Sequence, residues 1–327
     1  MKVFVTGANG LLGCNVVREL LKQSHEVRIL VRPGADLTGL NGVNCEVVNG
    51  ELLNQEVLDI STSGFDVIIH AAANTSQWPT NLKYYEAINI QGTEMVINAV
   101  RKKKIQKLIH VSTANTFGYG TKECPGTEET LYRFKDLGSG YITSKYIAQQ
   151  HVLEQVRNHG LPAVIVNPTF MIGPYDAKPG SGRIIQMGMK KNLQVFPSGG
   201  KNFIHVRDAA VAICNAILHG LPGECYLLAN ENLTYREFFT KLNQVIKKRT
   251  IQIKLPDSII KSAGLAGSWV EKTFGKPTPL NKINAELLTN GNYYSGAKAV
   301  EFLRMPQTPV ETAISEAINW WKDIHLL

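Results

Sequence analysis

Apolar runs and amphipathic stretches alternate along the first half of the chain. Between the runs, apolar residues return every three or four positions, which predicts helices over Leu11 to Lys22, Leu82 to Arg101 and Tyr141 to Arg157. Parallel strands that are apolar throughout and joined by crossover helices form a sheet buried on both faces. The pattern therefore predicts an α/β fold with a doubly wound parallel sheet of the Rossmann type. The predicted strands are Val3 to Val5, Val27 to Val31, Cys45 to Val48, Val67 to Ile69, Leu108 to Val111 and Ala163 to Val166.

The alternation of strands and helices ends near Pro168, and turn-forming clusters of proline and glycine follow it. We predict that a smaller C-terminal substrate domain begins there. The chain is expected to return to the first sheet through strands near Phe203 to Val206 and Tyr226 to Leu228. The predicted boundaries are 1–168 with a return near 203–230 for the first, larger domain, and 169–202 with 231–327 for the substrate domain.

A glycine loop, TGANGLLG, follows the first strand and opens the first helix. In such a loop Gly7 makes the tight turn, Gly10 lets the backbone approach a pyrophosphate, and Gly13 packs the helix against the strand. The positive end of the helix then meets the anion. We predict dinucleotide binding through the loop residues Gly7, Asn9, Gly10, Leu11, Leu12 and Gly13.

The end of the second strand indicates which dinucleotide is bound. An acid at this place hydrogen-bonds the ribose 2′-hydroxyl of NAD, whereas a cation accommodates the 2′-phosphate of NADP. Here Val31 stands where the acid is expected, and Arg32 can offer a planar, bidentate fork to phosphate. We predict NADP. NAD stays open, because Arg32 can also be an exposed cation at a strand end.

Two further strand ends belong to the same predicted cleft. Glu51 and Leu52 follow the third strand, and the Glu51 carboxylate can accept a hydrogen bond from the adenine amino group. The small residues Ala71, Ala72 and Ala73 follow the fourth strand and permit close approach of the backbone. His70, which precedes them, is interpreted as a hydrogen-bonded structural residue.

A phenol and an ammonium group lie four residues apart in the third predicted helix, as Tyr141 and Lys145, and hence on one face. A neighbouring cation favours the phenolate and lowers the phenol's pKa, which makes Tyr141 a candidate acid or base. The preceding strand ends in Ser112 and Thr113, which place hydroxyl groups at the carboxyl edge of the sheet.

With these residues in view, the chain resembles the extended short-chain dehydrogenase/reductase family, which includes NAD-dependent epimerases, dehydratases and dihydroflavonol reductases. The resemblance covers essentially the whole chain. Its motifs are Thr6 to Gly13, His70 to Ala72, Asn89 with Gly92-Thr93, Ser112-Thr113, Tyr141 with Lys145, Asn167-Pro168, Gly173-Pro174 and Asn202 to Val206 with Asp208.

The resemblance implies a role for each matched residue. Tyr141 would transfer the proton, Lys145 would bind the nicotinamide ribose and lower the pKa of Tyr141, and Thr113 would hydrogen-bond the substrate oxygen. It also implies a homodimer, in which the second and third predicted helices pack against the same pair of a partner. The remaining expected cofactor contacts are Asn89, Ser112, Pro168, Thr169 and Phe170.

Departures from the sugar-modifying branches favour net reduction. Thr113 is followed by Ala114 and Asn115, where the dehydratases of the family have acids. Lys201 stands where nucleotide-sugar epimerases typically have an arginine that grips the diphosphate. We predict an NADP-dependent oxidoreductase that reduces a ketone or aldehyde on a small to medium organic substrate.

Two alternatives stay open. The first is a nucleotide-sugar 4-epimerase that uses NAD, with Lys201 and Arg207 as its diphosphate-binding cations; the stretch 167–179 also resembles hopanoid-associated sugar epimerases. The second is a cofactor-bound sensor or interaction protein without turnover.

The composition of the chain limits the classes of ligand and the cellular location that we expect for the protein. The chain has 327 residues, 44% hydrophobic and 19% charged, with 35 Lys and Arg against 27 Asp and Glu. A net charge of +8 favours anionic ligands, but no basic cluster is interleaved with aromatics, so no nucleic acid is expected.

The chain has five cysteines, and they form no metal-binding pattern. We therefore predict free thiols and no metal site. With no room for a signal peptide before Val3, and no apolar run that approaches the roughly 20 residues of a membrane span, a cytoplasmic protein is expected.

The region 256–275 is predicted to be an amphipathic helix whose apolar positions pack on the core. A lid, a dimer contact or a peripheral membrane contact are the alternatives. Its apolar positions are Ile259, Ile260, Ala263, Ala266, Val270 and Phe274.

Overall fold

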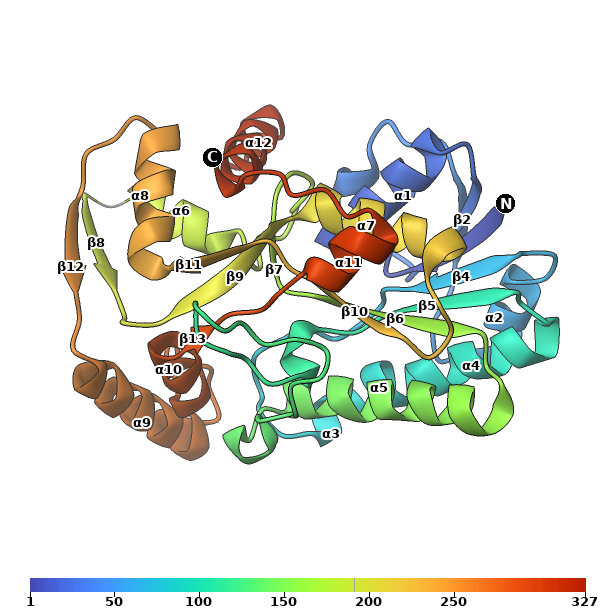
Figure 1. The fold of residues 1–327 in the computed structure, drawn as a ribbon, viewed down its shortest axis with the longest axis horizontal. Coiled ribbons are helices and arrows are strands. Elements are labelled where there is room, and N and C mark those ends of the chain that lie inside the picture. The colour runs from blue at the N-terminus through green and yellow to red at the C-terminus, as the bar shows by residue number, and fades with distance from the viewer. Residues whose placement is uncertain (191) are drawn as a thin grey trace.

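A seven-stranded parallel sheet forms the centre of the larger part of the molecule (Figure 1). The computed structural model describes residues 1–190 and 192–327. The strands lie in the order β10-β6-β5-β4-β1-β2-β3, and every neighbouring pair is parallel. The predicted doubly wound α/β fold is therefore confirmed. The strands are β1 (Lys2–Thr6), β2 (Glu26–Val31), β3 (Glu46–Asn49), β4 (Val67–His70), β5 (Lys107–Val111), β6 (Ala163–Pro168) and β10 (Cys225–Leu228).

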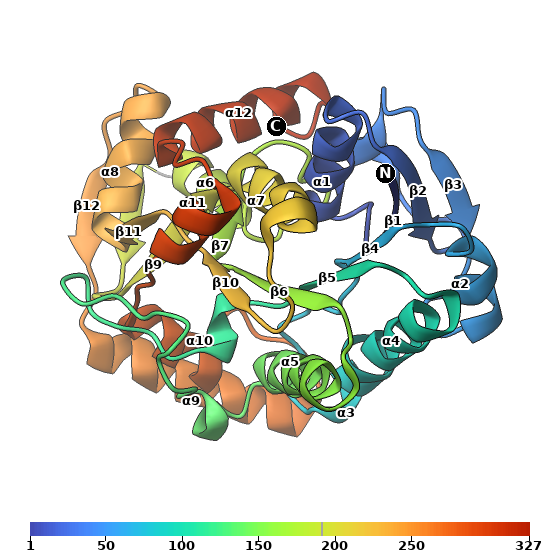
Figure 2. The same cartoon turned by 45° about the vertical axis from the view of Figure 1, so that its right-hand side comes forward.

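Alternate residues of the central strands enter two separate cores, one on each face of the sheet. In β1, Val3 and Val5 pack into the core beneath α1 (Leu11–Lys22) and α7 (Val206–His219), whereas Phe4 packs into the core on the other face. Figures 1 and 2 show α1, α7 and α11 on one side of the sheet and α2, α4 and α5 on the other. The remaining bounds are α2 (Gln55–Ser61), α4 (Gly92–Lys103), α5 (Gly140–His159) and α11 (Ala297–Leu303).

A second, smaller sheet and its helices form the rest of the molecule. Its core is aromatic: Phe203 and Phe238 stack with ring centroids 4.5 Å apart, and Trp321 is fully buried. The strands here are β7 (Phe170–Ile172), β9 (Gly200–His205), β11 (Glu231–Thr234) and β13 (Gly291–Asn292), with β8 (Leu193–Phe196) and β12 (Ile251–Lys254) as a separate pair. The helices are α6 (Arg183–Lys190), α8 (Tyr235–Val245), α9 (Asp257–Phe274), α10 (Lys282–Thr289) and α12 (Val310–Asp323).

The return of the chain to the large sheet differs from the expectation. The strand near Tyr226 does join it, as β10 beside β6. The strand near Phe203 does not: it is β9, which pairs with β7 and β11 in the small sheet. The expectation for Phe203 is wrong because β7 begins directly after β6 and offers β9 a closer partner.

The long helix predicted over Leu82 to Arg101 is interrupted. It comprises the short α3 (Lys83–Tyr85), a π-helical turn at Glu86–Gln91 and then α4. Short 3₁₀ turns occur at Thr38–Leu40, Ala114–Thr116 and Lys135–Leu137. The interrupted segment packs against α5, so the irregular turn lies beside the predicted catalytic helix.

Helix α9 contradicts the expectation of core packing. Only Ile260 and Gly264 of this helix are buried, whereas Ile259 and Phe274 are 55% and 62% exposed. Gly264 lets α9 approach α10 closely, because a Cβ there would lie 2.5 Å from the Cβ of Ala285. The helix therefore lies on α10 by a narrow contact and leaves most of its apolar side chains in solvent.

Candidate active site

The glycine loop has the shape that a phosphate group requires. Gly7 has φ of +74°, and a Cβ there would lie 2.5 Å from the amide nitrogen of Ala72. A Cβ on Gly13 would lie 2.1 Å from the Gly7 carbonyl oxygen, so only glycine fits either place. Gly10 has no such conflict, and it caps α1 without a side-chain hydrogen bond or an acid in the first turn. The open amide groups of this helix end fit the pyrophosphate of a dinucleotide.

A directed chain of hydrogen bonds ties the loop strand to the neighbouring strand ends. The Ala72 amide donates to Thr6 Oγ1 at 3.3 Å, and Thr6 Oγ1 lies 2.8 Å from His70 Nδ1. On the other side of the ring, His70 Nε2 lies 3.2 Å from Thr93 Oγ1, which donates to the Asn89 carbonyl. Burial, and then the charge of Lys145, lower the pKa of His70 to about 3. A neutral, doubly hydrogen-bonded His70 agrees with its structural interpretation.

The residues expected at the adenosine end lie in two different environments. Arg32 and Glu51 are exposed, and Arg32 forms no side-chain hydrogen bond or ion pair within residues 1–190 and 192–327. Leu52 is buried against Gly92, where a Cβ would lie 2.6 Å from Leu52 Cδ2. Asn9 donates to the Asp36 carbonyl at 3.4 Å, which ties the glycine loop to the segment after β2. Arg32 is thus free to meet a phosphate.

The three predicted catalytic residues come together at the carboxyl end of β5. Tyr141 and Lys145 lie one turn apart on α5, which begins at the Ser139 cap. The side chain of Tyr141 hydrogen-bonds that of Thr113, just after β5. Lys145 is buried, and its Nζ donates to the Val111 carbonyl at 2.7 Å. Two hydroxyl groups and an ammonium group therefore converge from a strand end and the helix that crosses beside it.

The pKa of Tyr141 differs from the expectation. Burial raises it above its ordinary value, and the hydrogen bond with Thr113 opposes this only in part. The expected depression by Lys145 is not found, because the ammonium group is directed to the Val111 carbonyl. Burial lowers the pKa of Lys145 itself to about 8. At neutral pH the phenol holds its proton and Lys145 is cationic.

A buried amide network holds the segment that carries Thr113. Asn167 at the end of β6 donates through Nδ2 to the Thr113 carbonyl at 3.1 Å and to Gln149 Oε1 at 2.7 Å. Thr116 Oγ1 lies 2.8 Å from each of the same two acceptors, and its single proton can be donated to either of them. Sequence reasoning missed Gln149 and Thr116. Gln149 lies four residues beyond Lys145 on α5, and that spacing was the only signal for it.

The π-helical turn contributes a second positioning contact. Asn89 Nδ2 donates to Ser144 Oγ at 2.9 Å, and Ser144 donates to the Tyr141 carbonyl at 2.7 Å. The Asn89 side chain also contacts the backbone of Asn74. Asn89 is buried, so in this structure it positions the first turn of α5.

The remaining predicted contacts line the edge between the two sheets. Ser112 Oγ is buried and has no hydrogen-bond partner within the described part of the chain. Such an orphaned hydroxyl fits a site that a ligand completes. Thr169 Oγ1 donates to Asn202 Oδ1 at 2.7 Å, and Pro168 is buried beside it. The Phe170 ring faces Lys201, whose Nζ lies 5.2 Å from the ring centroid.

The two cations considered for a diphosphate differ in availability. Arg207 forms an ion pair with Glu316 on α12 at 2.5 Å, and its side chain is 53% exposed. Lys201 is half-buried and forms no ion pair with any described residue, and burial lowers its pKa to about 8. Of these two cations, Arg207 has a carboxylate partner and Lys201 has none among the described residues.

Comparison with known proteins identifies the family. The sequence profile described as the NAD dependent epimerase/dehydratase family matches residues 3–229. The chain belongs to this family. The matched span contains the seven strands of the large sheet, the glycine loop and the Tyr141–Lys145 pair. The chain is therefore an NAD(P)-dependent oxidoreductase with a nicotinamide dinucleotide as cofactor, and the resemblance to extended short-chain dehydrogenases/reductases is confirmed.

Two of the similar proteins carry reductase names. A Synechocystis sp. protein whose name proposes dihydroflavonol 4-reductase activity is 28% identical over 333 residues, covering 98% of this chain and 94% of the relative. The 4-hydroxy-2-methyl-3-oxo-4-farnesyl-3,4-dihydroquinoline-1-oxide ketoreductase of Stigmatella aurantiaca is 32% identical over 246 residues, 74% of this chain and 72% of the relative. A crystal structure titled gox2253 superposes with a TM-score of 0.87 at 29% identity, and the match covers 98% of each chain.

The burial of Lys145 predicts a pH-dependent stability. Its pKa falls from 10.5 to about 8 on folding, so between these values the unfolded chain binds more protons and the folded state gains stability as pH rises. The Lys145→Met variant lacks this gain. From pH 8 to 9.5 we expect wild type to gain up to about 1.4 kcal/mol per pH unit relative to the variant, measured by urea unfolding without cofactor.

The matched control is Lys178→Met, whose side chain is 78% exposed and whose stability curve should run parallel to that of wild type. Lys201 titrates in all three proteins and cancels in the comparison. Parallel curves for wild type and Lys145→Met across this range would show that Lys145 is not desolvated on folding.

Proposed function

We propose that the protein is an NADP-dependent reductase of a ketone or aldehyde carbonyl on a small to medium organic substrate. The observation that carries the proposal is the hydroxyl pair of Thr113 and Tyr141, with the Lys145 ammonium group buried one turn away. This arrangement lies at the carboxyl edge of the sheet, and the glycine loop lies at the same edge, directly after β1.

The chemistry follows from where these groups hold their protons. When bound, the nicotinamide would supply the hydride that reduces the carbonyl carbon. Tyr141 keeps its proton at neutral pH because its pKa is raised, and it can give that proton to the carbonyl oxygen. Thr113 Oγ1 accepts from the Asn115 amide, which leaves its own proton to stabilise the same oxygen.

Ala114 and Asn115 follow Thr113, so no acid stands ready for the elimination step of a dehydratase. Two further observations favour reduction over epimerisation. Lys201 stands where nucleotide-sugar epimerases typically have an arginine, so a bidentate clamp for a diphosphate is missing at this place. The two relatives described above are named as reductases, and one of them acts, by its name, on a farnesylated ketone. A nucleotide-sugar 4-epimerase is the outcome that the assay below is designed to detect.

Replacement of Tyr141 tests the catalytic assignment. Without its phenol the carbonyl has no proton donor, so Tyr141→Phe should reduce kcat by roughly 100- to 10,000-fold. Cofactor affinity should change little. The measurement is the loss of reduced-nicotinamide absorbance with NADPH and a panel of apolar ketones and aldehydes.

The matched control is Tyr146→Phe, which removes a phenol from the same helix where Tyr146 stacks on Tyr132. Its kcat should stay near that of wild type. If wild type consumes no NADPH across the panel yet interconverts UDP-glucose and UDP-galactose, the protein is an epimerase. Wild-type activity of Tyr141→Phe in either assay would overturn the role of Tyr141.

Cofactor preference is tested at Arg32. If its guanidinium binds the 2′-phosphate, Arg32→Ala should weaken NADP binding by about 1 to 3 kcal/mol and leave NAD binding nearly unchanged. Calorimetric titration of both cofactors measures this. Arg157→Ala removes an exposed arginine from the last turn of α5, at the opposite edge of the sheet, and should alter neither affinity. Equal losses for NADP and NAD in Arg32→Ala would contradict the assignment.

We also propose a homodimer through α4 and α5. Both helices cover the same face of the large sheet, and Arg101 on α4 contacts Gln155 on α5 (Figure 2). An isologous contact would bring the two pairs together as four helices. Light scattering at micromolar concentration should report twice the 36.1 kDa of one chain. A mass of one chain would exclude this dimer.

A further inference from the structure

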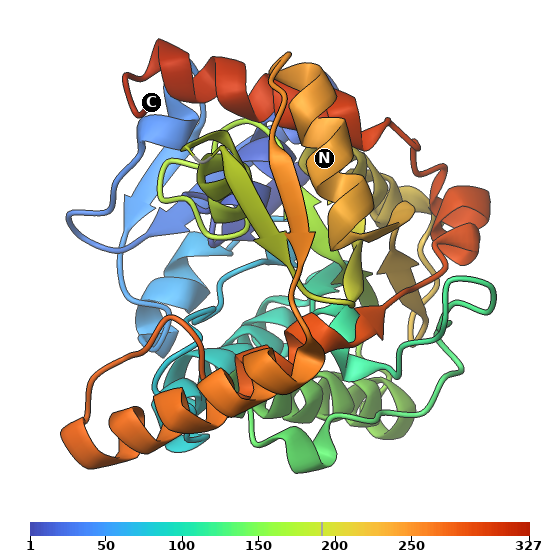
Figure 3. The same cartoon turned by 90° about the vertical axis from the view of Figure 1, so that its left-hand side faces the viewer.

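We propose that the face formed by β8, β12 and α9 docks onto an anionic phospholipid bilayer. The reductase proposal is not needed for this inference, which rests on exposed apolar side chains and on a segment with an excess of positive charge. Figure 3 shows the three elements together on the side of the molecule that faces the viewer, with α9 running below the two strands. We call this surface the α9–β12 face.

The strand part of the α9–β12 face is an uncovered apolar sheet. Ile251 pairs with Leu193 and Ile253 pairs with Val195 in parallel register. Residues in register project to the same side of a sheet, and all four are exposed, Ile251 by 67%. The opposite side of β8 carries the buried Gln194 and Phe196. The four aliphatic side chains therefore form one contiguous outward patch.

Helix α9, which runs below the two strands, carries further exposed apolar side chains. Leu265 and Trp269 lie one turn apart on its exposed side, and Phe274 at its end meets the Trp269 ring edge-on with centroids 6.3 Å apart. Trp269 is 64% exposed. Tryptophan is enriched where a protein meets the boundary between lipid headgroups and acyl chains. No helix among the described residues is long and apolar enough to cross a bilayer, so contact here would be with its surface.

The same segment carries most of the chain's excess charge. Residues 247–282 contain eight Lys or Arg and two Asp or Glu, a net charge of +6 against +8 for the whole chain. Both acids are turned inward: Asp257 accepts from Ser198, and Glu271 accepts from Thr278. The exposed cations that form no ion pair with a described residue include Lys272 and Lys276 on and just after α9. This charge complements a negatively charged lipid surface.

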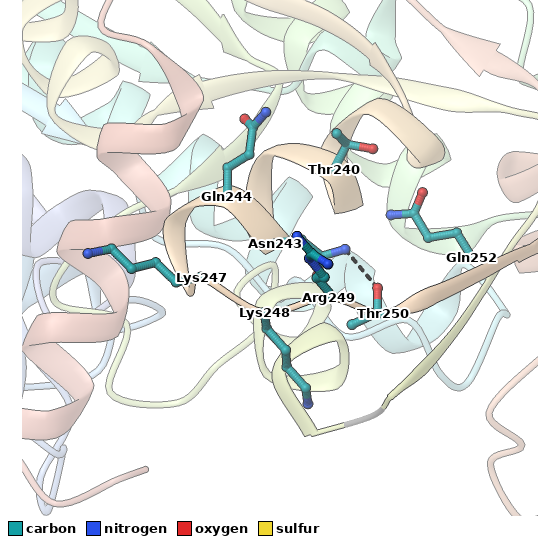
Figure 4. Close-up of a pocket in the computed structure, with 8 residues that line it drawn as sticks. All are labelled: Thr240, Asn243, Gln244, Lys247, Lys248, Arg249, Thr250 and Gln252. Carbon is teal, nitrogen blue, oxygen red and sulfur yellow. Dashed lines mark hydrogen bonds between the residues drawn. The ribbon is translucent and has the colours of Figure 1, made fainter.

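The cations do not converge on a single ligand. A hollow of about 590 Å³ lies at the start of the basic segment, between α8 and β12. Figure 4 shows that Lys247 and Lys248 on its wall point away from each other. Asn243, also on the wall, already donates to Thr250 Oγ1 at 2.7 Å. Cations spread in this way suit an extended anionic surface rather than one bound phosphate.

A second copy of the chain fits this face less well. An isologous contact would bring two basic segments of charge +6 against each other, and like charges across an interface are repulsive. Apolar side chains interspersed with lysines are typical of helices that lie in the membrane interface. A bilayer with anionic headgroups satisfies both the apolar and the cationic groups at once.

Vesicle binding tests the proposal with the full-length protein and without any turnover. Wild type should co-sediment with vesicles of equal parts phosphatidylglycerol and phosphatidylcholine, and far less with phosphatidylcholine alone. Trp269→Ser should lower the partition coefficient by about tenfold, because a large apolar ring is lost from the interface. Lys272→Glu with Lys276→Glu should lower it by roughly 30-fold or more, since each cation near such a surface contributes about fivefold. Added NaCl should weaken binding by screening.

Two controls match these changes. Leu218→Ser removes an equally exposed apolar side chain from α7, and Lys2→Glu with Lys22→Glu makes the same charge change near the first strand and helix. Both should bind as wild type does. Circular dichroism checks that each variant is folded, and Phe274→Ser replaces Trp269→Ser if that variant is not.

Several outcomes would overturn the proposal. Binding to neither vesicle, equal binding to both, or wild-type binding by the Trp269 and lysine variants would each do so. If wild type without vesicles is a dimer by light scattering and Trp269→Ser is a monomer, the α9–β12 face is a contact between copies of the chain instead.

Discussion

Every strand of the large sheet runs in the same direction, and both faces of the sheet are buried. Each connection must therefore cross a face of the sheet before the next strand begins. All strands begin at one edge of the sheet, and their carboxyl ends meet at the opposite edge. Thr6, His70, Val111 and Asn167 lie at that edge although they are far apart in the sequence. The glycine loop, the Thr113 segment and the start of α5 depend on this constraint for their proximity.

The electrostatics of the same edge are unusual because the Lys145 ammonium group is buried there with no carboxylate partner among the described residues. Lys145 is held by a backbone carbonyl, and burial keeps the neighbouring His70 and His110 neutral by lowering their pKa values. An unpaired buried ammonium group is unfavourable for folding. The lowering of the Lys145 pKa to about 8 reflects this unfavourable burial of the charged form. A buried, perturbed cation next to a phenol and an orphaned hydroxyl is the pattern expected of a site arranged for a ligand rather than for stability.

The proposed catalytic site and the proposed membrane-binding face differ in how firmly their side chains are held. Thr113 and Lys145 are buried, and the side chains of Asn167 and Asn89 hold the Thr113 segment and the first turn of α5 in place. The α9–β12 face is held by few contacts and presents side chains outward. A rigid site and a loosely attached, apolar and basic face can therefore evolve independently on one chain, since no described side chain belongs to both.

The sequence by itself determined the large sheet and its chemistry, because those signals are local. Apolar runs mark strands that are buried on both faces, and the glycines of the loop are required by steric conflicts within a few residues of each other and with the adjacent strand. The four-residue spacing of Tyr141 and Lys145 likewise follows from helical geometry. The family profile then confirmed what these motifs together had indicated.

Only the tertiary structure decided the features that depend on distant partners. Phe203 lies in the small sheet because β7 is its neighbour in space, and Ile259 and Phe274 are exposed because α10 covers only a narrow strip of α9. The pKa of Tyr141 is raised rather than lowered because Lys145 is directed to the Val111 carbonyl, a contact between residues 34 positions apart. A periodic pattern states which residues share a face, but it does not state what covers that face, and burial and hydrogen-bond direction depend on the covering partner.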